Sequence, residues 1–180
     1  MRITGGSLRG RKVAVPPGII RPSMDKMRES VFASLGDISG LSFLDIFSGS
    51  GIIALEAASR GAVNIEAVEQ DKQKRKILIE NVSISPSRIN CHFVPAEVYI
   101  KRSKNCFDII FLDPPYPYRF KWELTKNIAS SVLVKAGTKI LIHRPHEDPL
   151  KTEIPLLEKT DSREYGRSIV DFFVLTESVS

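Results

Sequence analysis

Cysteines and long hydrophobic runs are scarce in this chain of 180 residues. Its two cysteines, Cys91 and Cys106, lie far apart in the sequence, which excludes a disulfide framework and a zinc-binding motif. We expect two free thiols that are buried or half-buried. No apolar run approaches the about 18 residues that cross a bilayer, and the first residues lack the apolar core of a signal peptide. A cytoplasmic protein without a membrane partner is expected.

Metal-ligating residues are also few. The chain has three histidines, of which His143 and His146 form a pair with two residues between them. Because no third ligand accompanies them, we expect no metal site and interpret both as solvent-facing loop residues. With 42% hydrophobic and 26% charged residues, the composition excludes disorder and suits one globular domain with a short appendage.

Positive charge is concentrated at the amino terminus. Among residues 1–30, seven basic residues stand against two acidic ones, which accounts for the whole formal net charge of +5. A basic arm on a neutral body suits binding of nucleic-acid phosphates, and the alternative is a solvated terminus. We expect an arm or small hairpin over 1–22 and a main domain over 23–180. The candidate phosphate ligands are Arg9, Arg11, Lys12, Arg21 and Arg28.

Apolar strands and amphipathic helices alternate along the main domain. After a helix over 23–35, strands are expected at 42–46, 62–69, 89–94, 107–112 and 138–143, and helices at 51–60, 71–82, 96–103 and 120–131. This alternation predicts an α/β fold with a mostly parallel sheet covered on both faces. The segments 154–160 and 168–175 have no helical pattern between them. They predict a terminal antiparallel hairpin at the sheet edge.

A glycine-containing loop follows the first strand of this pattern. Phe47, Ser48, Gly49, Ser50 and Gly51 follow the strand residue Asp45 and open the next helix. Glycines let backbone N–H groups approach a ligand there, and Glu69, about 20 residues on, is placed to hold ribose hydroxyls. A nicotinamide site, an S-adenosylmethionine site and a simple packing turn all fit this pattern. Asp45 favours S-adenosylmethionine, because it would repel a pyrophosphate but attract an ammonium group.

The strongest chemical signal is the turn Asp113, Pro114, Pro115 and Tyr116, which directly follows an apolar strand. Two prolines enforce extended geometry and remove N–H groups, so the Pro114 carbonyl can act as an acceptor beside the Asp113 carboxylate. Tyr116 offers a face for a base, and such stacking contributes about 1–3 kcal/mol. Two acceptors and a stacking ring suggest methylation of an exocyclic base amine.

Together these motifs resemble class I S-adenosylmethionine-dependent methyltransferases, and more narrowly the bacterial 16S ribosomal RNA guanine-966 N2-methyltransferase family. The resemblance extends over nearly the whole length, from Leu8–Lys12 and Arg21–Glu29 to Tyr165 and Gly166. It implies a Rossmann-like seven-stranded sheet with the last strand antiparallel. It also implies a monomer that acts on 16S ribosomal RNA in the small ribosomal subunit or an assembly intermediate of it.

The resemblance also implies roles for individual residues. Catalysis would fall to Asp113, Pro114, Pro115 and Tyr116. S-adenosylmethionine would be bound by Asp45, Phe47, Ser48, Gly49, Ser50, Gly51, Glu69, Gln70, Ala96 and Asp113.

Two positions depart from the family pattern. Pro95 replaces an aspartate that accepts from the cofactor adenine, which leaves that contact to Glu97 or to the backbone near Ala96. Tyr116 stands where the guanine enzymes generally carry phenylalanine and adenine-N6 enzymes carry tyrosine. An adenine-N6 methyltransferase of DNA or RNA is therefore the main alternative. A nicotinamide-dependent oxidoreductase is a weaker one, because it gives Asp113 no role.

Overall fold

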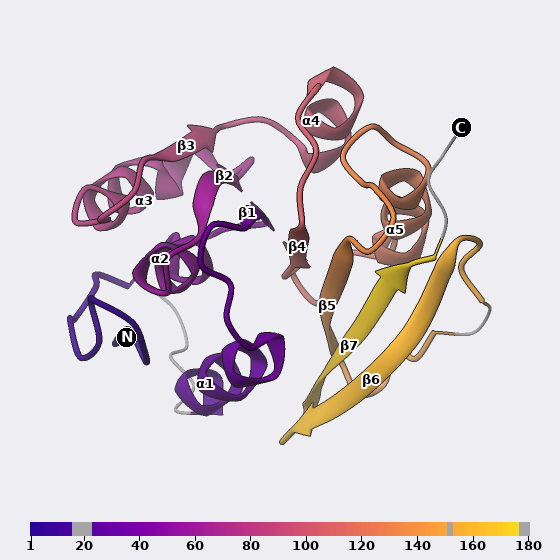
Figure 1. The fold of residues 1–180 in the computed structure, drawn as a ribbon, viewed down its shortest axis with the longest axis horizontal. Helices are drawn as coiled ribbons and strands as arrows, with labels where there is room; N and C mark the ends of the chain where they lie inside the picture. The colour runs from indigo at the N-terminus through magenta and orange to yellow at the C-terminus, as the bar shows by residue number, and fades with distance from the viewer. Residues whose placement is uncertain (16–22, 151–152, 177–180) are drawn as a thin grey trace.

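Seven strands form one sheet at the centre of the computed structural model, which describes residues 1–15, 23–150 and 153–176 (Figure 1). The strand order is β3-β2-β1-β4-β5-β7-β6. Strands β1 to β5 are parallel, and β7 pairs antiparallel with both β5 and β6. The strands are β1 Ser42–Ile46, β2 Val63–Val68, β3 Ile89–His92, β4 Ile109–Leu112, β5 Lys139–Pro145, β6 Leu157–Tyr165 and β7 Ser168–Leu175.

Helices cover both faces of this sheet because its central strands are apolar on both sides. One buried cluster joins the sheet to α1 and α2, with residues next to and within α3 packed against it, and a second joins the sheet to α4 and α5. Strands β1 and β4 are buried at every position, as expected for parallel strands between two helix layers. The helices are α1 Ser23–Leu35, α2 Ile52–Ser59, α3 Arg75–Val82, α4 Ala96–Arg102 and α5 Lys121–Ala129.

Every strand and helix expected from the sequence has a counterpart, and two elements have a boundary that differs by more than two residues. The helix expected over 71–82 begins as the 3-10 turn Lys72–Lys74, because the Asp71 side chain accepts from the Gln73 N–H and fixes that turn. The strand expected over 154–160 lies at 157–165 instead. That strand is β6, an edge strand whose side chains are mostly exposed, so it lacks the apolar alternation that marks a strand in a sequence.

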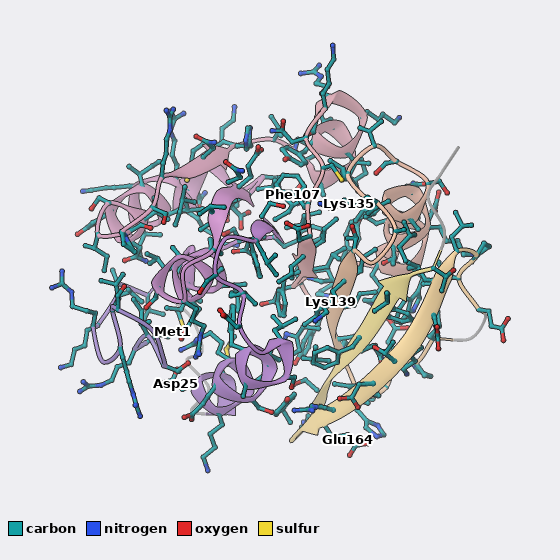
Figure 2. The ribbon with its side chains drawn as sticks, viewed as in Figure 1. Met1, Asp25, Phe107, Lys135, Lys139 and Glu164 are labelled. Carbon is teal, nitrogen blue, oxygen red and sulfur yellow. The ribbon has the colours of Figure 1, made fainter. Side chains whose placement is uncertain are left out.

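The amino-terminal segment forms a small hairpin that is fixed to the body. Arg2 and Lys12 form an antiparallel bridge, and Ile3 and Val13 are buried in the cluster shared with α1 and α2. Backbone and side-chain groups of Ser59 bind the chain at Gly5, Ser7 and Leu8. In Figure 2, Met1 of the hairpin lies close to Asp25 of α1. The expected hairpin is present, and it shares its core with the main domain.

The cysteines are partly as expected. Both are free, and Cys91 on β3 is half-buried, but Cys106 is exposed and the expectation of burial there is wrong. Cys106 lies in the connection between α4 and β4, where no helix or strand covers it. Within the described residues, no group of three metal-ligating side chains occurs, and no helix is long and apolar enough to cross a membrane.

Candidate active site

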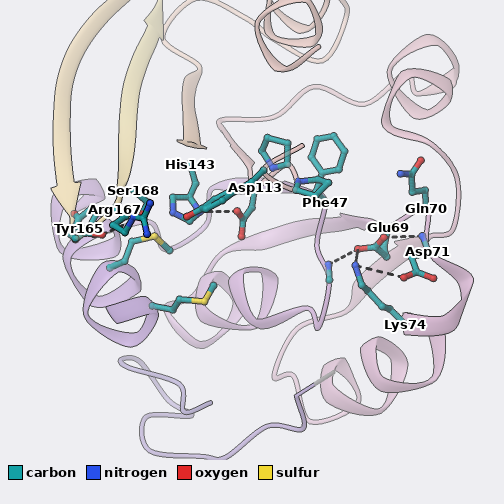
Figure 3. Close-up of a pocket in the computed structure, with 17 residues that line it drawn as sticks. Phe47, Glu69, Gln70, Asp71, Lys74, Asp113, His143, Tyr165, Arg167 and Ser168 are labelled. Atoms are coloured by element: carbon teal, nitrogen blue, oxygen red, sulfur yellow. Dashed lines mark hydrogen bonds and ion pairs between the residues drawn. The ribbon is translucent and has the colours of Figure 1, made fainter. Parts of the chain in front are cut away.

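A cleft of about 920 Å³ opens where the strand order reverses, at the carboxyl ends of β1 and β4. Open α/β sheets bind their ligands at such a switch point, because the connections on its two sides diverge to opposite faces. In Figure 3, Glu69, Gln70, Asp71 and Lys74 occupy one end of the cleft. Tyr165, Arg167 and Ser168 occupy the other end, with Asp113 between them.

The loop after β1 adopts the geometry that its glycines permit. Phe47, Gly49 and Gly51 all have positive φ angles, of 66°, 57° and 79°. The φ angle of Gly51 favours glycine, and a Cβ there would also crowd the Val82 Cγ1 at 3.0 Å. The Ser48 N–H bonds to the Val68 carbonyl at 2.9 Å, which fixes the loop beside the end of β2. Phe47 and Gly49 line the cleft as a result.

Asp45 lies beneath this loop and is fully buried. Its Oδ2 accepts from the Ser48 hydroxyl at 2.5 Å and from the Ala54 N–H at 3.2 Å. Burial, together with smaller effects of the nearby Asp113 and Glu69 carboxylates, raises the pKa of Asp45 to about 7, although the hydrogen bonds from Ser48 and Ala54 oppose this. Asp45 Oδ1 is buried without a hydrogen-bond partner among the described residues. Asp45 thus holds the loop, and its contact with a cofactor stays a prediction.

Glu69 follows β2 and connects the glycine loop to the start of the next helical segment. Its Oε2 accepts from the Gly49 N–H and its Oε1 from the Asp71 N–H, both at 2.8 Å. Lys74 approaches Oε2 at 3.7 Å. Glu69 is buried apart from the edge that faces the cleft, which is also lined by Gln70 and Asp71. Its contact with the hydroxyl groups of a ribose stays a prediction.

The turn after β4 lies on the opposite wall of the cleft. The Asp113 N–H bonds to the Ile46 carbonyl at 3.1 Å, so β1 and β4 stay paired up to the motif. Pro114 is buried, whereas the Asp113 side chain is 27% exposed and Tyr116 is 40% exposed. All four residues of the turn line the cleft beside Phe47 and Gly49. The two motifs expected to act together are therefore brought to one site.

His143 contradicts its interpretation as a solvent-facing loop residue. It lies within β5, is 5% exposed, and places its Nδ1 2.7 Å from Asp113 Oδ1. The cause is the register, because β5 is the parallel neighbour of β4, with Ile142 opposite Leu112, and the next residues are His143 and Asp113. A histidine beyond a buried parallel strand was the signal that could have placed it at this edge. His146 is exposed, as expected.

The far end of the cleft was not found by sequence reasoning. Met24 and Met27 of α1 form one wall, and the β6–β7 turn contributes Tyr165, Arg167 and Ser168. The Tyr165 hydroxyl shares a 2.7 Å hydrogen bond with the Ser30 hydroxyl, which ties this turn to α1. More than 100 residues separate the two walls in sequence, so no local pattern links them.

Ala96, expected to contact the cofactor, is buried at the start of α4 and is not among the residues that line the cleft. Its role stays a prediction. Glu97 is exposed and accepts from the Tyr118 hydroxyl at 2.5 Å. The Tyr118 ring packs against Phe47, with ring centroids 5.1 Å apart. Glu97, Tyr118 and Phe47 thus connect α4 to the glycine loop beside the cleft.

The expected phosphate ligands divide into three groups. Arg9, Arg11 and Lys12 are exposed on the hairpin, and Arg21 lies outside the described residues. The expectation for Arg28 is wrong, because its side chain is fully buried. Its guanidinium bonds to Asp25 at 2.6 Å and to the Arg2 carbonyl at 2.9 Å, and lies 3.5 Å from Glu56. Arg28 links the hairpin to α1 and α2, and its buried side chain is not accessible to RNA.

Comparison with known proteins places this site in a family. Residues 1–174 match the model of the family described as conserved hypothetical protein 95. The chain belongs to this family. The solved structure of a candidate methyltransferase from Escherichia coli covers 98% of both chains, with a TM-score of 0.86 and 26% identity. This chain therefore has the class I methyltransferase fold, and the fold expected from the sequence is confirmed.

Curated relatives of this chain carry a functional name. Ribosomal RNA small subunit methyltransferase D of Haemophilus influenzae is 30% identical over 163 residues, which are 84% of this chain and 82% of that protein. The Escherichia coli K12 protein of the same name is 36% identical over 121 residues, or 64% of this chain. That match spans 60% of the length of the Escherichia coli protein. The resemblance to ribosomal RNA methyltransferases inferred from the motifs is confirmed.

The residues around the glycine loop fit S-adenosylmethionine. Glu69 lines the cleft and its carboxylate suits ribose hydroxyls, whereas Asp45 is fully buried and is not among the residues that line the cleft, so its contact with an ammonium group stays a prediction. Glycines at the loop leave space for a ligand against the backbone, since a Cβ at Gly49 would meet only the Phe47 carbonyl, at 4.0 Å. A pyrophosphate in the cleft would lie beside the carboxylates of Glu69 and Asp113, which disfavours a dinucleotide.

Proposed function

We propose that this protein uses S-adenosylmethionine to methylate the exocyclic N2 amine of a guanine in 16S ribosomal RNA. The observation that carries this proposal is the meeting of the Asp113–Tyr116 turn with the glycine loop and Glu69 in one cleft. The names of the curated relatives support ribosomal RNA as the substrate class. The guanine and its N2 amine come from the family resemblance of the motifs.

The cleft offers a donor site and an acceptor site on the two sides of Asp113. Glu69, Gln70 and the loop from Phe47 to Gly51 would hold the cofactor, which when bound supplies an electrophilic methyl group. The part of the cleft beyond Asp113, between Met24, Met27 and the β6–β7 turn, would receive the target base. Holding two reactants in near-attack geometry can contribute up to about 7–11 kcal/mol in ideal cases.

The turn after β4 would activate the amine. An exocyclic amine is a poor nucleophile because its lone pair is delocalised into the ring. Asp113 and the Pro114 carbonyl would accept hydrogen bonds from the two N–H groups of the amine and favour a pyramidal nitrogen. Tyr116 would stack on the base. Positive charge grows on the nitrogen during transfer, so these acceptors bind the transition state more tightly than the ground state.

The hairpin would hold the surrounding RNA. Arg9, Arg11 and Lys12 are exposed and would contact phosphates, and Arg21 is proposed to join them. The target base has to leave its stack to reach Tyr116, so an unpaired nucleotide is the cheaper substrate. We propose that the protein acts as a monomer on the small ribosomal subunit or an assembly intermediate of it.

Product analysis tests this function directly. Small subunits from a strain lacking this gene are incubated with the purified protein and S-adenosylmethionine, and the nucleosides of the 16S ribosomal RNA are identified by mass spectrometry. N2-methylguanine is expected. N6-methyladenine in its place would establish the adenine-N6 methyltransferase. Tyr116 is the motif residue that favours this alternative.

A variant of the turn provides the control. Asp113→Ala should lower the rate of methyl transfer by about 100-fold to 1000-fold, in line with the loss of one preorganised polar group. Calorimetry should show that S-adenosylhomocysteine still binds this variant. If the wild type binds a nicotinamide dinucleotide but not S-adenosylhomocysteine, the protein is an oxidoreductase and the methyltransferase proposal is wrong.

A further inference from the structure

The contact between His143 and Asp113 is a part-buried polar interaction of the cleft for which the proposed reaction gives no role. His143 Nδ1 lies 2.7 Å from Asp113 Oδ1. The imidazole is 5% exposed, and its Nε2 is buried without a hydrogen-bond partner among the described residues. Figure 3 shows the ring beside the Asp113 carboxylate, on the side away from Phe47. A buried histidine with one nitrogen on a catalytic carboxylate and the other unpartnered calls for an explanation.

The geometry defines the tautomer of His143. Asp113 lines an open cleft with 27% of its side chain exposed, so its carboxylate is an acceptor. Nδ1 therefore carries the proton that is donated to Oδ1, and Nε2 of the neutral ring carries the lone pair. A proton on Nε2 would be a buried N–H without an acceptor, which costs more than an unpaired lone pair beside apolar atoms.

We propose that His143 is a positioning residue, whose neutral ring orients Asp113 and whose protonation slows methyl transfer. This inference rests on the proposed function. The Nδ1–H bond occupies Oδ1 and leaves Oδ2 to accept an N–H of the target amine. In the reaction the N–C bond forms, the S–C bond breaks with its electron pair going to sulfur, and the nitrogen releases one proton, which Oδ2 receives and passes to solvent.

The charge of His143 matters because it opposes the charge that develops in the reaction. With a neutral ring, the pair of Asp113 and His143 bears one negative charge, which stabilises the growing positive charge on the amine nitrogen. An imidazolium would cancel that charge and make Oδ2 a weaker acceptor. Protonation of the His143 ring at acidic pH should therefore lower the rate.

We assign this pH dependence to His143 after considering the groups that face it from neighbouring elements. Asp113 comes from the end of β4 and Tyr116 from the turn, with ring centroids 6.4 Å apart. The β6–β7 turn brings Tyr165 and Arg167 to the cleft, and the Arg167 side chain is 86% exposed and bound to Glu147. Among the described residues of α1, the uncharged Met24 and Met27 line the cleft, and β7 pairs Val170 with His143.

The test compares three proteins in single-turnover methyl transfer to small subunits at saturating S-adenosylmethionine and RNA, between pH 5.5 and 8.5. The wild type should lose rate tenfold per pH unit on the acidic side. His143→Asn keeps a donor to Oδ1 without a titrating ring, so its rate should stay within about tenfold of the wild type at pH 8 and be independent of pH. His143→Leu should be about 100-fold slower than the wild type at pH 8 and also independent of pH, with KM values for cofactor and RNA within threefold.

Two controls separate this proposal from simpler explanations. The pKa of about 7 at Asp45 falls in the same pH range, so the profile of Asp45→Asn is recorded as well, and it should retain the acidic loss of rate. Nitrogen-15 NMR of the unliganded wild type, which is independent of activity, should show the proton of His143 on Nδ1. Binding of S-adenosylhomocysteine and the melting temperature establish that each variant is folded.

Three results would contradict the proposed role of His143. An acidic loss of rate that persists in His143→Asn, a His143→Leu variant as fast as the wild type, or a proton on Nε2 would overturn the role of His143. A wild type that transfers no methyl group to RNA at any pH would instead sink the proposed function. The two failures are therefore distinguishable.

Discussion

At the scale of single residues, burial decides the charge of Asp45. This aspartate has no cation near its unpartnered Oδ1 among the described residues, and burial raises its pKa from 3.8 to about 7. The unfolded chain therefore releases this proton near pH 4, while the folded protein retains it until near pH 7. Since the folded state binds more protons in this window, its stability decreases as the pH rises from 4 to 7.

Asp45→Asn should reverse this loss. An amide is neutral at every pH and can still accept from the Ser48 hydroxyl and the Ala54 N–H, so at pH 8 the free energy of unfolding should increase by about 2–4 kcal/mol. Near pH 4 the variant and the wild type should be equally stable. Urea unfolding at the two pH values measures both quantities. A gain of the same size at pH 4 would show that the pKa of Asp45 is not the cause.

Arg28 is a second residue whose role follows from burial. Its guanidinium lies between Asp25, Glu56 and the Arg2 carbonyl, and both Arg28 and Glu56 are fully buried. Arg28→Met should lower the free energy of unfolding by about 3–5 kcal/mol, because Glu56 would remain as a buried charge with a weakened set of partners. Urea unfolding measures this loss. The matched control is Arg9→Met on the exposed hairpin, which should change stability by less than about 0.5 kcal/mol.

At the scale of elements, the hairpin combines a fixed backbone with free charges. Glu56 accepts from the Thr4 N–H at 2.6 Å. The Asn81 side chain accepts from the Ala14 N–H and donates to the Ala14 carbonyl. Arg9, Arg11 and Lys12 are exposed on this anchored support. A rigid element that carries cations loses little conformational entropy when it binds phosphates, which favours RNA binding here over a solvated terminus.

Replacing Arg9, Arg11 and Lys12 by Gln should weaken binding of small-subunit RNA and lower the slope of log K against log salt concentration by about 2–3. Affinity for S-adenosylhomocysteine should not change. The control is the triple Gln variant of Lys101, Lys104 and Lys126, which removes equal charge from the α4 and α5 side of the sheet. Equal salt slopes for the two variants would leave the hairpin with a structural role only. Filter binding at several salt concentrations gives both slopes.

At the scale of the whole molecule, the hairpin and the main domain share one hydrophobic core. Ile3 and Val13 are buried in the same cluster as residues of α1, α2 and the central strands. The division of the chain at residue 22 therefore describes expected roles, and it stays a prediction. Elements that share a core are expected to unfold together.

Hydrogen exchange tests this cooperativity. The Ile3 N–H bonds to the Arg11 carbonyl and the Val13 N–H to the Met1 carbonyl, so both amides report on the hairpin. They should exchange with a free energy within about 1 kcal/mol of amides in the buried strands β1 and β4, because opening the hairpin exposes the shared core. Exchange several kcal/mol easier at Ile3 and Val13 would instead mean that the hairpin opens independently.

Local patterns were sufficient for the sheet, its helices and the two motifs. Apolar strands alternating with helices predicted a parallel sheet, and in such a sheet the residues after neighbouring strands meet at one edge. The loop from Phe47 to Gly51, Glu69 and the turn from Asp113 to Tyr116 could therefore be assigned to one site before any contact was known. Their conformations depend mainly on their own glycines and prolines.

Only the tertiary structure decided what is buried and which distant walls meet. Arg28 and His143 look like surface residues in sequence, yet packing of the hairpin on α1 and the register of β5 on β4 enclose both of them. Met24, Met27 and the β6–β7 turn reach the cleft because α1 and the last strands fold against each other. Burial and register depend on contacts between segments far apart in the chain, and a local pattern carries no information about them.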